Sequence, residues 1–182
     1  MSTTEQDGTT YESGYGRRPS VTDKEGFDRG TGTGEPTEEV AHKLRLMKRA
    51  DDGYNARDWP DFLDTMQSED VVVHQIGAPV THGRDAHRRD MEMWIGAFPD
   101  MRVHNDPYDI QFGQGDWTVA MGRISGTFTG QLRLPDGTVV EPTGKAFETF
   151  FTTIGHWRNE QIDIQYVLYD AQDIMAQIEA GR

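Results

Sequence analysis

The sequence contains no cysteine among its 182 residues. This absence excludes disulfide bonds, thiolate nucleophiles and cysteine-ligated metal sites. It also fits the reducing conditions of the cytoplasm, where we expect this protein to reside. Long apolar runs are missing as well, since no stretch approaches the roughly 20 residues that a transmembrane helix needs. Residues 1–18 lack the apolar segment of a secretory signal peptide.

Positive charge is scarce. Lys and Arg number 18 against 31 Asp and Glu, which gives a formal net charge of −13. Phosphate backbones and anionic lipid surfaces repel such a protein, and no cluster of basic residues offsets the repulsion. We therefore expect neither nucleic acid nor a membrane as a partner.

Apolar residues are also few in the N-terminal segment, residues 1–36, which is rich in Gly, Thr, Ser and charged residues. Such a segment buries too little apolar surface to offset the entropy lost on ordering. We predict an arm that is flexible, or that orders only against the rest of the protein or another subunit. Residues 37–182 form the predicted globular domain.

The domain begins with helical patterns and continues with strands. A first helix is predicted after Thr37, a residue type that caps helix N-termini, with Val40, Leu44, Met47 and Tyr54 on one stripe. Helices followed by an antiparallel meander indicate an α+β fold. The other predicted elements are a short helix at 59–66, a strand at 70–76, a helix at 83–98, β-rich segments from 101 to 170, and a short helix at 171–180.

Five blocks of this sequence resemble, in order, the SnoaL-like polyketide cyclases and ester cyclases of the nuclear-transport-factor-2-like (NTF2-like) superfamily. They are YNARDWPDFLDTMQSEDVVVH, HGRDAHRRDMEMWIGAFPDM, GRISGTFTGQ, PTGKAFETFF and IDIQYVLYD. The resemblance implies a cone-shaped barrel, in which a curved antiparallel sheet wraps N-terminal helices around an internal apolar pocket. It also implies a dimer or tetramer formed through the sheet, and aldol ring closure of a polyketide without metal or cofactor.

Three residues are candidates for acid/base chemistry. His74 shares a strand face with Val72 and Ile76, and it is either a pocket base or a core histidine bonded to a neighbour. Asp170 ends the last strand, just before a helical pattern. Its position favours a helix N-cap, with a lowered pKa, over a catalytic acid.

The third candidate is Asp163. A tight turn at residues 158–161 places His156 beside Asp163, whereas Asp170 is about 23 Å further along the strand at 3.3 Å per residue. His156 and Asp163 can therefore form a pair, which is either catalytic or a solvated surface contact.

The last strand departs from the family pattern. In the cyclases that it resembles, the catalytic aspartate directly follows a tryptophan in this strand. Tyr166 takes the place of that tryptophan here, and Val167 takes the place of the aspartate. The departure favours a protein that binds a ligand without converting it.

A further set of residues is predicted to contact the ligand. Trp94 either supports a flat ligand or packs in the core, Tyr54 offers a phenol at the pocket mouth or packs, and Glu148 is a pocket acid or an edge charge. His82 and His87 are five residues apart, which does not suit metal binding on one helix face, so we predict no metal. The ligand-contact set is Tyr54, Trp94, Glu148, Phe151, Thr153, Gln165, Val167 and Tyr169.

Two functions follow from these patterns. The first is a cofactor-free cyclase or isomerase that acts on a hydrophobic, carbonyl-rich small molecule through acid/base chemistry. The second is a small-molecule-binding protein that lacks the family's aspartate. Epoxide hydrolysis is a third possibility, but it requires an Asp–Arg–Asp arrangement that the strand faces do not clearly offer.

Overall fold

The computed structural model of the protein describes residues 36–133 and 137–179. The predicted arm falls outside the described residues except for its last position. The described elements are α1 (Glu38–Ala56), the π-helix η2 (Pro60–Thr65), β1 (Gln67–Gln75), β2 (Thr81–His82), α2 (Arg84–Ala97), β3 (Arg102–His104), β4 (Ile110–Gln114), β5 (Trp117–Thr127), β6 (Leu132–Arg133), β7 (Val139–Val140), β8 (Ala146–Arg158), β9 (Gln161–Tyr169) and α3 (Ala171–Gln177).

The first helix forms as its sequence predicts. The Thr37 hydroxyl accepts a hydrogen bond from the Val40 N–H at 3.3 Å, and Glu38 and Glu39 lie in the first turn, where the helix dipole favours acids. Val40, Met47 and Tyr54 of the predicted stripe are buried, and Leu44 is half-buried. The predicted short helix is η2, with Pro60 at its start, where the missing N–H is not needed.

The strands form one seven-stranded sheet and a separate two-stranded sheet of β6 and β7. The strand order of the large sheet is β2-β1-β9-β8-β5-β3, and β4 also pairs with β5. The sheet is antiparallel, as predicted, except that β1 and β9 pair in parallel. Within the described residues the two edges of the large sheet do not pair with each other. The sheet is curved but open, not a closed barrel.

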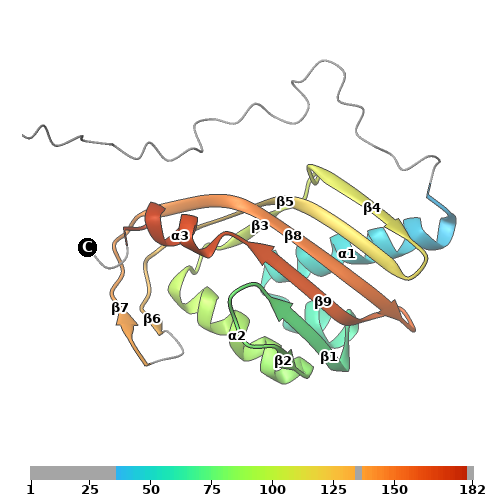
Figure 1. Ribbon diagram of the computed structural model, residues 1–182, viewed down its shortest axis with the longest axis horizontal. Helices are drawn as coiled ribbons and strands as arrows, with labels where there is room; N and C mark the ends of the chain where they lie inside the picture. The colour runs from blue at the N-terminus through green and yellow to red at the C-terminus, as the bar shows by residue number, and fades with distance from the viewer. Residues whose placement is uncertain (1–35, 134–136, 180–182) are drawn as a thin grey trace, which may run out of the picture. The chain divides into compact units, whose positions relative to one another are not determined.

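Helices α1 and α2 lie on one face of the sheet (Figure 1). Alternate residues of β5 and β8 are buried on this face, including Ala120, Ile124 and Phe151, and the residues between them are half-buried or exposed on the other face. The core therefore lies between the helices and the sheet. None of the helices in the described ranges combines the length and apolar character that a membrane span requires.

Hydrogen bonds fix α1 to the sheet near both ends of the helix. Lys43 Nζ lies 2.6 Å from Asp116 Oδ1, in the turn between β4 and β5. Near the other end, the Asn55 side chain donates to the Val103 carbonyl and accepts from the Val103 N–H, both at 2.8 Å. This amide acts like a strand neighbour of β3. The two attachments set the position of the residues between them, which include Asp51 and Tyr54.

Candidate functional site

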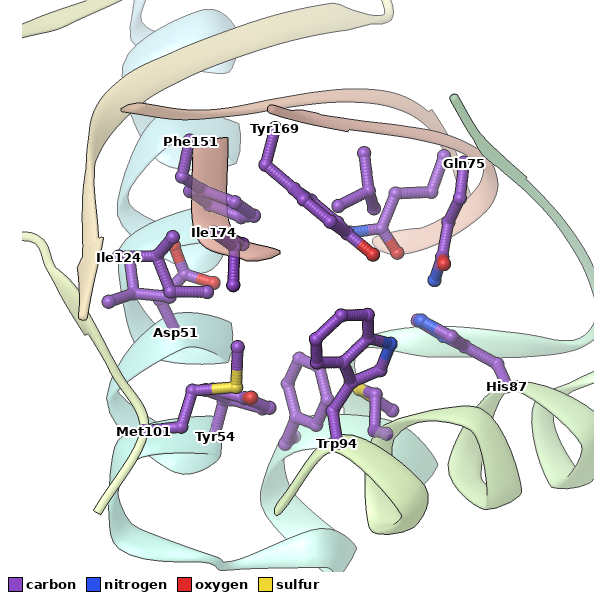
Figure 2. Close-up of a pocket in the computed structure, with 15 residues that line it drawn as sticks. Asp51, Tyr54, Gln75, His87, Trp94, Met101, Ile124, Phe151, Tyr169 and Ile174 are labelled. Atoms are coloured by element: carbon purple, nitrogen blue, oxygen red, sulfur yellow. The ribbon is translucent and has the colours of Figure 1, made fainter. Parts of the chain in front are cut away.

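A pocket lies between the two long helices and the sheet (Figure 2). Side chains enter it from α1, α2, β1 and β9. Most of its wall is apolar or aromatic, with a few polar groups. The lining residues are Asp51, Tyr54, Phe62, Gln75, His87, Met91, Trp94, Met101, Val103, Ile124, Phe151, Gln165, Val167, Tyr169 and Ile174.

Asp51 is the single acid among the described residues that line the pocket. It is buried on α1, one turn before Tyr54. Its Oδ2 atom accepts a hydrogen bond from the Tyr108 hydroxyl at 2.6 Å, and no described residue bonds to Oδ1. Burial raises the pKa of the Asp51 carboxyl to about 7, although the Tyr108 hydrogen bond opposes the rise. This carboxyl can therefore exchange a proton near neutral pH.

Two tyrosines present hydroxyl groups to the same pocket. Burial raises the pKa of Tyr169 to about 12, and it also raises the pKa of Tyr54 above its ordinary value. Both hydroxyls therefore stay protonated and can donate hydrogen bonds at neutral pH. The Trp94 ring stands edge-to-face against Tyr169, with centroids 5.8 Å apart. Together they form an aromatic wall with donor groups at its edge.

His87 enters the pocket from α2, on the side of Gln75 and away from Asp51 (Figure 2). Its Nδ1 atom lies 3.0 Å from the side-chain oxygen of Gln67. Burial lowers the pKa of His87 to about 4, so the ring is neutral at pH 7. Gln67 in turn donates to Gln165 Oε1 at 2.7 Å. This side of the pocket therefore carries polar groups but no charge at neutral pH.

Most of the predicted ligand contacts face the pocket. Thr153 is buried one layer behind the wall, where its hydroxyl accepts from Gln165 Nε2 at 3.1 Å. Glu148 is on the opposite face of the sheet and bonds to Arg123 at 2.5 Å, so it is an edge charge and not a pocket acid. The predicted residues that line the pocket are Tyr54, Trp94, Phe151, Gln165, Val167 and Tyr169.

The structure places His74 outside the pocket. The neighbouring residues Val73 and Gln75 face the helices, so His74 lies on the outer face of β1. Its ring stacks on Tyr166 with centroids 4.6 Å apart and an interplanar angle of 12°. The sequence assigned His74 to the wrong face because its half-apolar strand lacks a clear alternation.

Asp170 is also outside the pocket. It is the N-cap of α3, and its Oδ1 accepts from the Asp173 N–H at 3.0 Å. The cap prediction is thereby confirmed, and the exposed Asp170 is not among the residues that line the pocket.

Asp163 is on the outer face as well. His156 Nδ1 lies 2.6 Å from Asp163 Oδ1, as the hairpin geometry predicts, and Arg158 contacts the other oxygen at 3.2 Å. A β-bulge explains why Asp163 does not share a face with Gln165. His156 pairs with Ile164 and the next residue pairs with Ile162, so one residue of β9 is left over at Asp163. None of the three proposed catalytic residues is therefore among those that line the pocket.

Asp51 and His87 were not predicted to line the pocket, although the sequence pattern contains a signal for both. Asp51 lies four residues after Met47 and three before Tyr54, within the buried stripe of α1. His87 lies four residues before Met91 and seven before Trp94, on the buried side of α2. A polar residue in the middle of an apolar stripe is the signal that points to each of them.

Val167 faces the pocket, at the position where the resemblance implies an aspartate. The pocket thus has no carboxylate from β9, and its carboxylate comes from α1 instead. No group of three or more His, Asp or Glu side chains in the described part of the chain is arranged to hold a metal ion.

Solved structures with low sequence identity share this fold. A candidate SnoaL-like polyketide cyclase from Jannaschia sp. CCS1 matches with a TM-score of 0.71 and 18% identity, over 82% of this chain and 99% of that one. AclR, a candidate hydroxylase from Streptomyces galilaeus, gives 0.65 and 16%, over 77% and 86%. IdmH, a candidate polyketide cyclase from Streptomyces antibioticus, gives 0.62 and 19%, over 75% and 98%. At these identities the matches establish the fold and not the reaction.

Among curated protein sequences, none matches this chain. The family model of the SnoaL-like polyketide cyclases matches residues 44–178. That range includes every residue that lines the pocket. The chain therefore belongs to the SnoaL-like polyketide cyclase family.

Proposed function

We propose that this protein is a cofactor-free cyclase or isomerase that acts on a hydrophobic, carbonyl-rich small molecule, with Asp51 as its acid/base group. The observation that carries the proposal is a single buried carboxyl with a pKa of about 7, set in an apolar pocket with one oxygen free. A general base is most effective when its pKa is near the working pH. The proposal assigns to Asp51 the role first given to His74, Asp163 and Asp170.

The reaction is an aldol closure within one molecule. The Asp51 carboxylate removes a proton from a carbon next to a carbonyl group, which gives an enolate and the Asp51 carboxylic acid. The enolate carbon attacks a second carbonyl carbon and forms the new C–C bond. The resulting alkoxide takes the proton back from Asp51, so the catalyst returns to its starting state. The hydroxyls of Tyr54 and Tyr169 donate hydrogen bonds to the enolate oxygen, where negative charge develops.

The charges of the pocket support an uncharged ligand. None of its lining residues is Lys or Arg, so an anionic ligand would find no opposite charge there. The guanidinium of Arg57 packs over the Tyr54 ring at 5.3 Å, but its N–H groups bond to the carbonyl oxygens of Tyr54, Pro99 and Met101. A neutral ketone or ester satisfies the donors of the pocket without a buried, unpaired charge.

The second candidate is a non-catalytic carrier, and Val167 is the observation that favours it. The family's acid/base aspartate is replaced at a position that faces the pocket. A carrier holds its ligand without moving protons, so replacing Asp51 with asparagine would leave its ligand unchanged in structure and still bound.

Deuterium exchange separates the two candidates. The protein is incubated with phenylacetone in D₂O, and NMR follows the loss of the protons next to the carbonyl group. The cyclase proposal expects wild-type protein to accelerate exchange, with a rate that rises with pH and levels off above about pH 7, as Asp51 ionises. Asp51→Asn is expected to lose the acceleration, and Glu148→Gln on the outer face is the matched control. Equal rates in wild type and Asp51→Asn would contradict the proposal.

Native mass spectrometry of protein taken from its own host identifies the ligand class. Both candidate functions expect a small molecule that carries conjugated carbonyl groups and is lost on denaturation. A retained molecule of another class contradicts both. Turnover of a retained carbonyl compound by wild type but not by Asp51→Asn selects the enzyme.

We further propose that the protein acts in the cytoplasm and as a dimer or tetramer formed through its sheet. Exposed aromatic side chains on the outer face of the sheet support the assembly. Tyr166 is 38% exposed there and Trp117 is 40% exposed, and their ring centroids are 6.5 Å apart. Exposed aromatic side chains that gather on one face are typical of subunit interfaces.

A further inference from the structure

A continuous chain of buried hydrogen bonds links α2 to the centre of the sheet. His87 Nδ1 lies 3.0 Å from Gln67 Oε1, Gln67 Nε2 lies 2.7 Å from Gln165 Oε1, and Gln165 Nε2 lies 3.1 Å from Thr153 Oγ1. None of these four side chains belongs to a residue more than 8% exposed. Burial of four polar side chains costs free energy unless each makes its hydrogen bonds. The donor and the acceptor in each of these bonds are therefore significant.

The order of the chain fixes where the proton of His87 lies. Both amide groups donate in the direction of Thr153, so each amide oxygen accepts from the preceding member. An amide oxygen can only accept a hydrogen bond. His87 Nδ1 must therefore donate to Gln67 Oε1, and in the neutral ring the other nitrogen, Nε2, carries a lone pair.

That lone pair is open to the pocket. His87 lines the pocket, and Nε2 has no hydrogen-bond partner in the part of the chain that the structure describes. Figure 2 shows the ring directed toward Gln75 and Trp94. The negative charge of Asp90, on the same helix, raises the pKa of His87, but burial lowers it by more. Asp90 itself accepts a hydrogen bond from the Thr81 hydroxyl at 2.7 Å. The side chains of β1 and β9 that face His87 are neutral.

We propose that Gln67 is a positioning residue, which holds the proton of His87 on Nδ1 so that Nε2 accepts a hydrogen bond from an enol or hydroxyl group of the ligand. The catalytic meaning of this step rests on the proposed function, whereas the proton position itself does not. An acceptor at Nε2 repels a carbonyl oxygen, since two lone pairs would face each other. The ligand is then oriented with its O–H group at His87 and a carbonyl oxygen at the tyrosine hydroxyls.

Nitrogen-15 NMR of the histidine rings in the ligand-free protein tests the proton position. The other five histidines, His42, His74, His82, His104 and His156, are the internal references. In wild type at pH 7 we expect Nδ1 of His87 to give a pyrrole-type signal and Nε2 a pyridine-type signal. Gln67→Met removes the acceptor, so both nitrogens of His87 should show intermediate signals. Gln67→Glu keeps an acceptor and is expected to keep the wild-type pattern while raising the pKa of His87.

The matched control is Gln111→Met, which removes an exposed glutamine that donates to the Leu44 carbonyl at 3.1 Å. It should leave the His87 signals unchanged. A merely structural Gln67 would also leave them unchanged when replaced, and that result would overturn the proposal. A wild-type spectrum with the proton on Nε2 would overturn it directly, whether or not the Gln67 variants fold.

Ligand preference tests the second half of the proposal. The probes are 2-naphthol, which carries a hydroxyl donor, and 2-methoxynaphthalene, which does not. Calorimetry with wild type should show 2-naphthol binding at least fivefold tighter, and Gln67→Met should bring the two affinities together. Equal affinities for wild type would overturn the acceptor role of His87. Neither experiment requires turnover, so either can fail while the cyclase proposal stands, and the reverse also holds.

Discussion

Asp51 and His87 have their ordinary order of pKa values reversed. Burial raises the pKa of the carboxyl to about 7 and lowers that of the imidazole to about 4. Between these values both groups are uncharged in the folded protein. The same apolar surroundings thus keep both groups neutral. Ionisation of Asp51 destabilises the folded protein at high pH, and ionisation of His87 destabilises it at low pH. Groups whose environments separate their pKa values in this way are typical of acid/base sites.

The first prediction concerns Asp51→Asn. Because the pKa of Asp51 is raised on folding from 3.8, the folded protein binds this proton more tightly than the unfolded chain does. The stability linked to Asp51 is therefore present below pH 3.8 and is lost as the pH rises through 7. At pH 8 the loss is on the order of 4 kcal/mol, at 1.4 kcal/mol per pKa unit. We expect Asp51→Asn to be more stable than wild type at pH 8, by an amount that shrinks toward pH 4.5.

Urea unfolding at several pH values between 4.5 and 8 measures this difference. Asparagine keeps an oxygen that can accept from Tyr108, so the local packing is preserved. Asp52→Asn, which removes the adjacent exposed carboxylate, is the control and should show no comparable trend. A stability difference between Asp51→Asn and wild type that stays constant over this range would show that Asp51 is not held protonated by burial.

At the scale of single residues, the sequence predicted which aromatic and polar groups face the pocket better than it predicted the chemistry. Trp94, Phe151 and Tyr169, which were predicted to contact the ligand, line the pocket. Periodicity alone left open which face of β9 is the inner one. Asp51 was missed because only apolar residues were counted in the stripe of α1. The partner that orients it, Tyr108, lies 57 residues away in the chain, and such a contact leaves no local pattern.

At the scale of elements, the N-termini of α1 and α3 were predicted well because capping depends on a few adjacent residues. Thr37 and Asp170 cap α1 and α3 as their residue types indicate. Strand faces were less predictable. The bulge at Asp163 changes the alternation of β9, and the parallel pairing of β1 with β9 joins segments about 90 residues apart. Neither feature can be read from local sequence.

The second prediction concerns the cap of α3. Asp170→Ala removes the acceptor of the Asp173 N–H and should reduce the free energy of unfolding by about 1 kcal/mol. Urea unfolding measures the loss, and Gln172→Ala, in the exposed first turn of the same helix, is the control. The rate of deuterium exchange should stay near that of wild type, because Asp170 is outside the pocket. A hundredfold fall in that rate with unchanged stability would restore Asp170 as a catalytic acid.

At the scale of the whole molecule, the outer face of the sheet supports the third prediction. His74 stacks on Tyr166, and Trp117 packs against His156 with centroids 4.8 Å apart, so four adjacent strands each contribute a ring to this face. If subunits pair here, a charge at Tyr166 is buried without a partner and the assembly separates. We expect light scattering to give a dimer or tetramer for wild type and a 20.6 kDa monomer for Tyr166→Glu.

Val139→Glu is the matched control for this prediction. Val139 is 36% exposed, close to the exposure of Tyr166, but it lies in the separate β6–β7 sheet. This variant should keep the mass of wild type. A monomeric wild type, or a Tyr166→Glu variant with unchanged mass, would contradict assembly through the large sheet.

The last prediction joins the net charge of the protein to the composition of the pocket. The chain carries a formal charge of −13, and no Lys or Arg is among the residues that line the pocket. An anionic ligand is thus repelled during its approach and again when bound near Asp51. We expect methyl 2-naphthoate to bind at least tenfold tighter than 2-naphthoate at pH 8, as measured by calorimetry.

Salt separates the effect of the net charge from the effect of Asp51, because 1 M salt screens charges beyond about 3 Å. The part due to net charge should disappear in 1 M salt, whereas the part due to the buried Asp51 should remain and fall only in Asp51→Asn. Equal affinities for ester and acid would mean that the ligand does not sit beside Asp51.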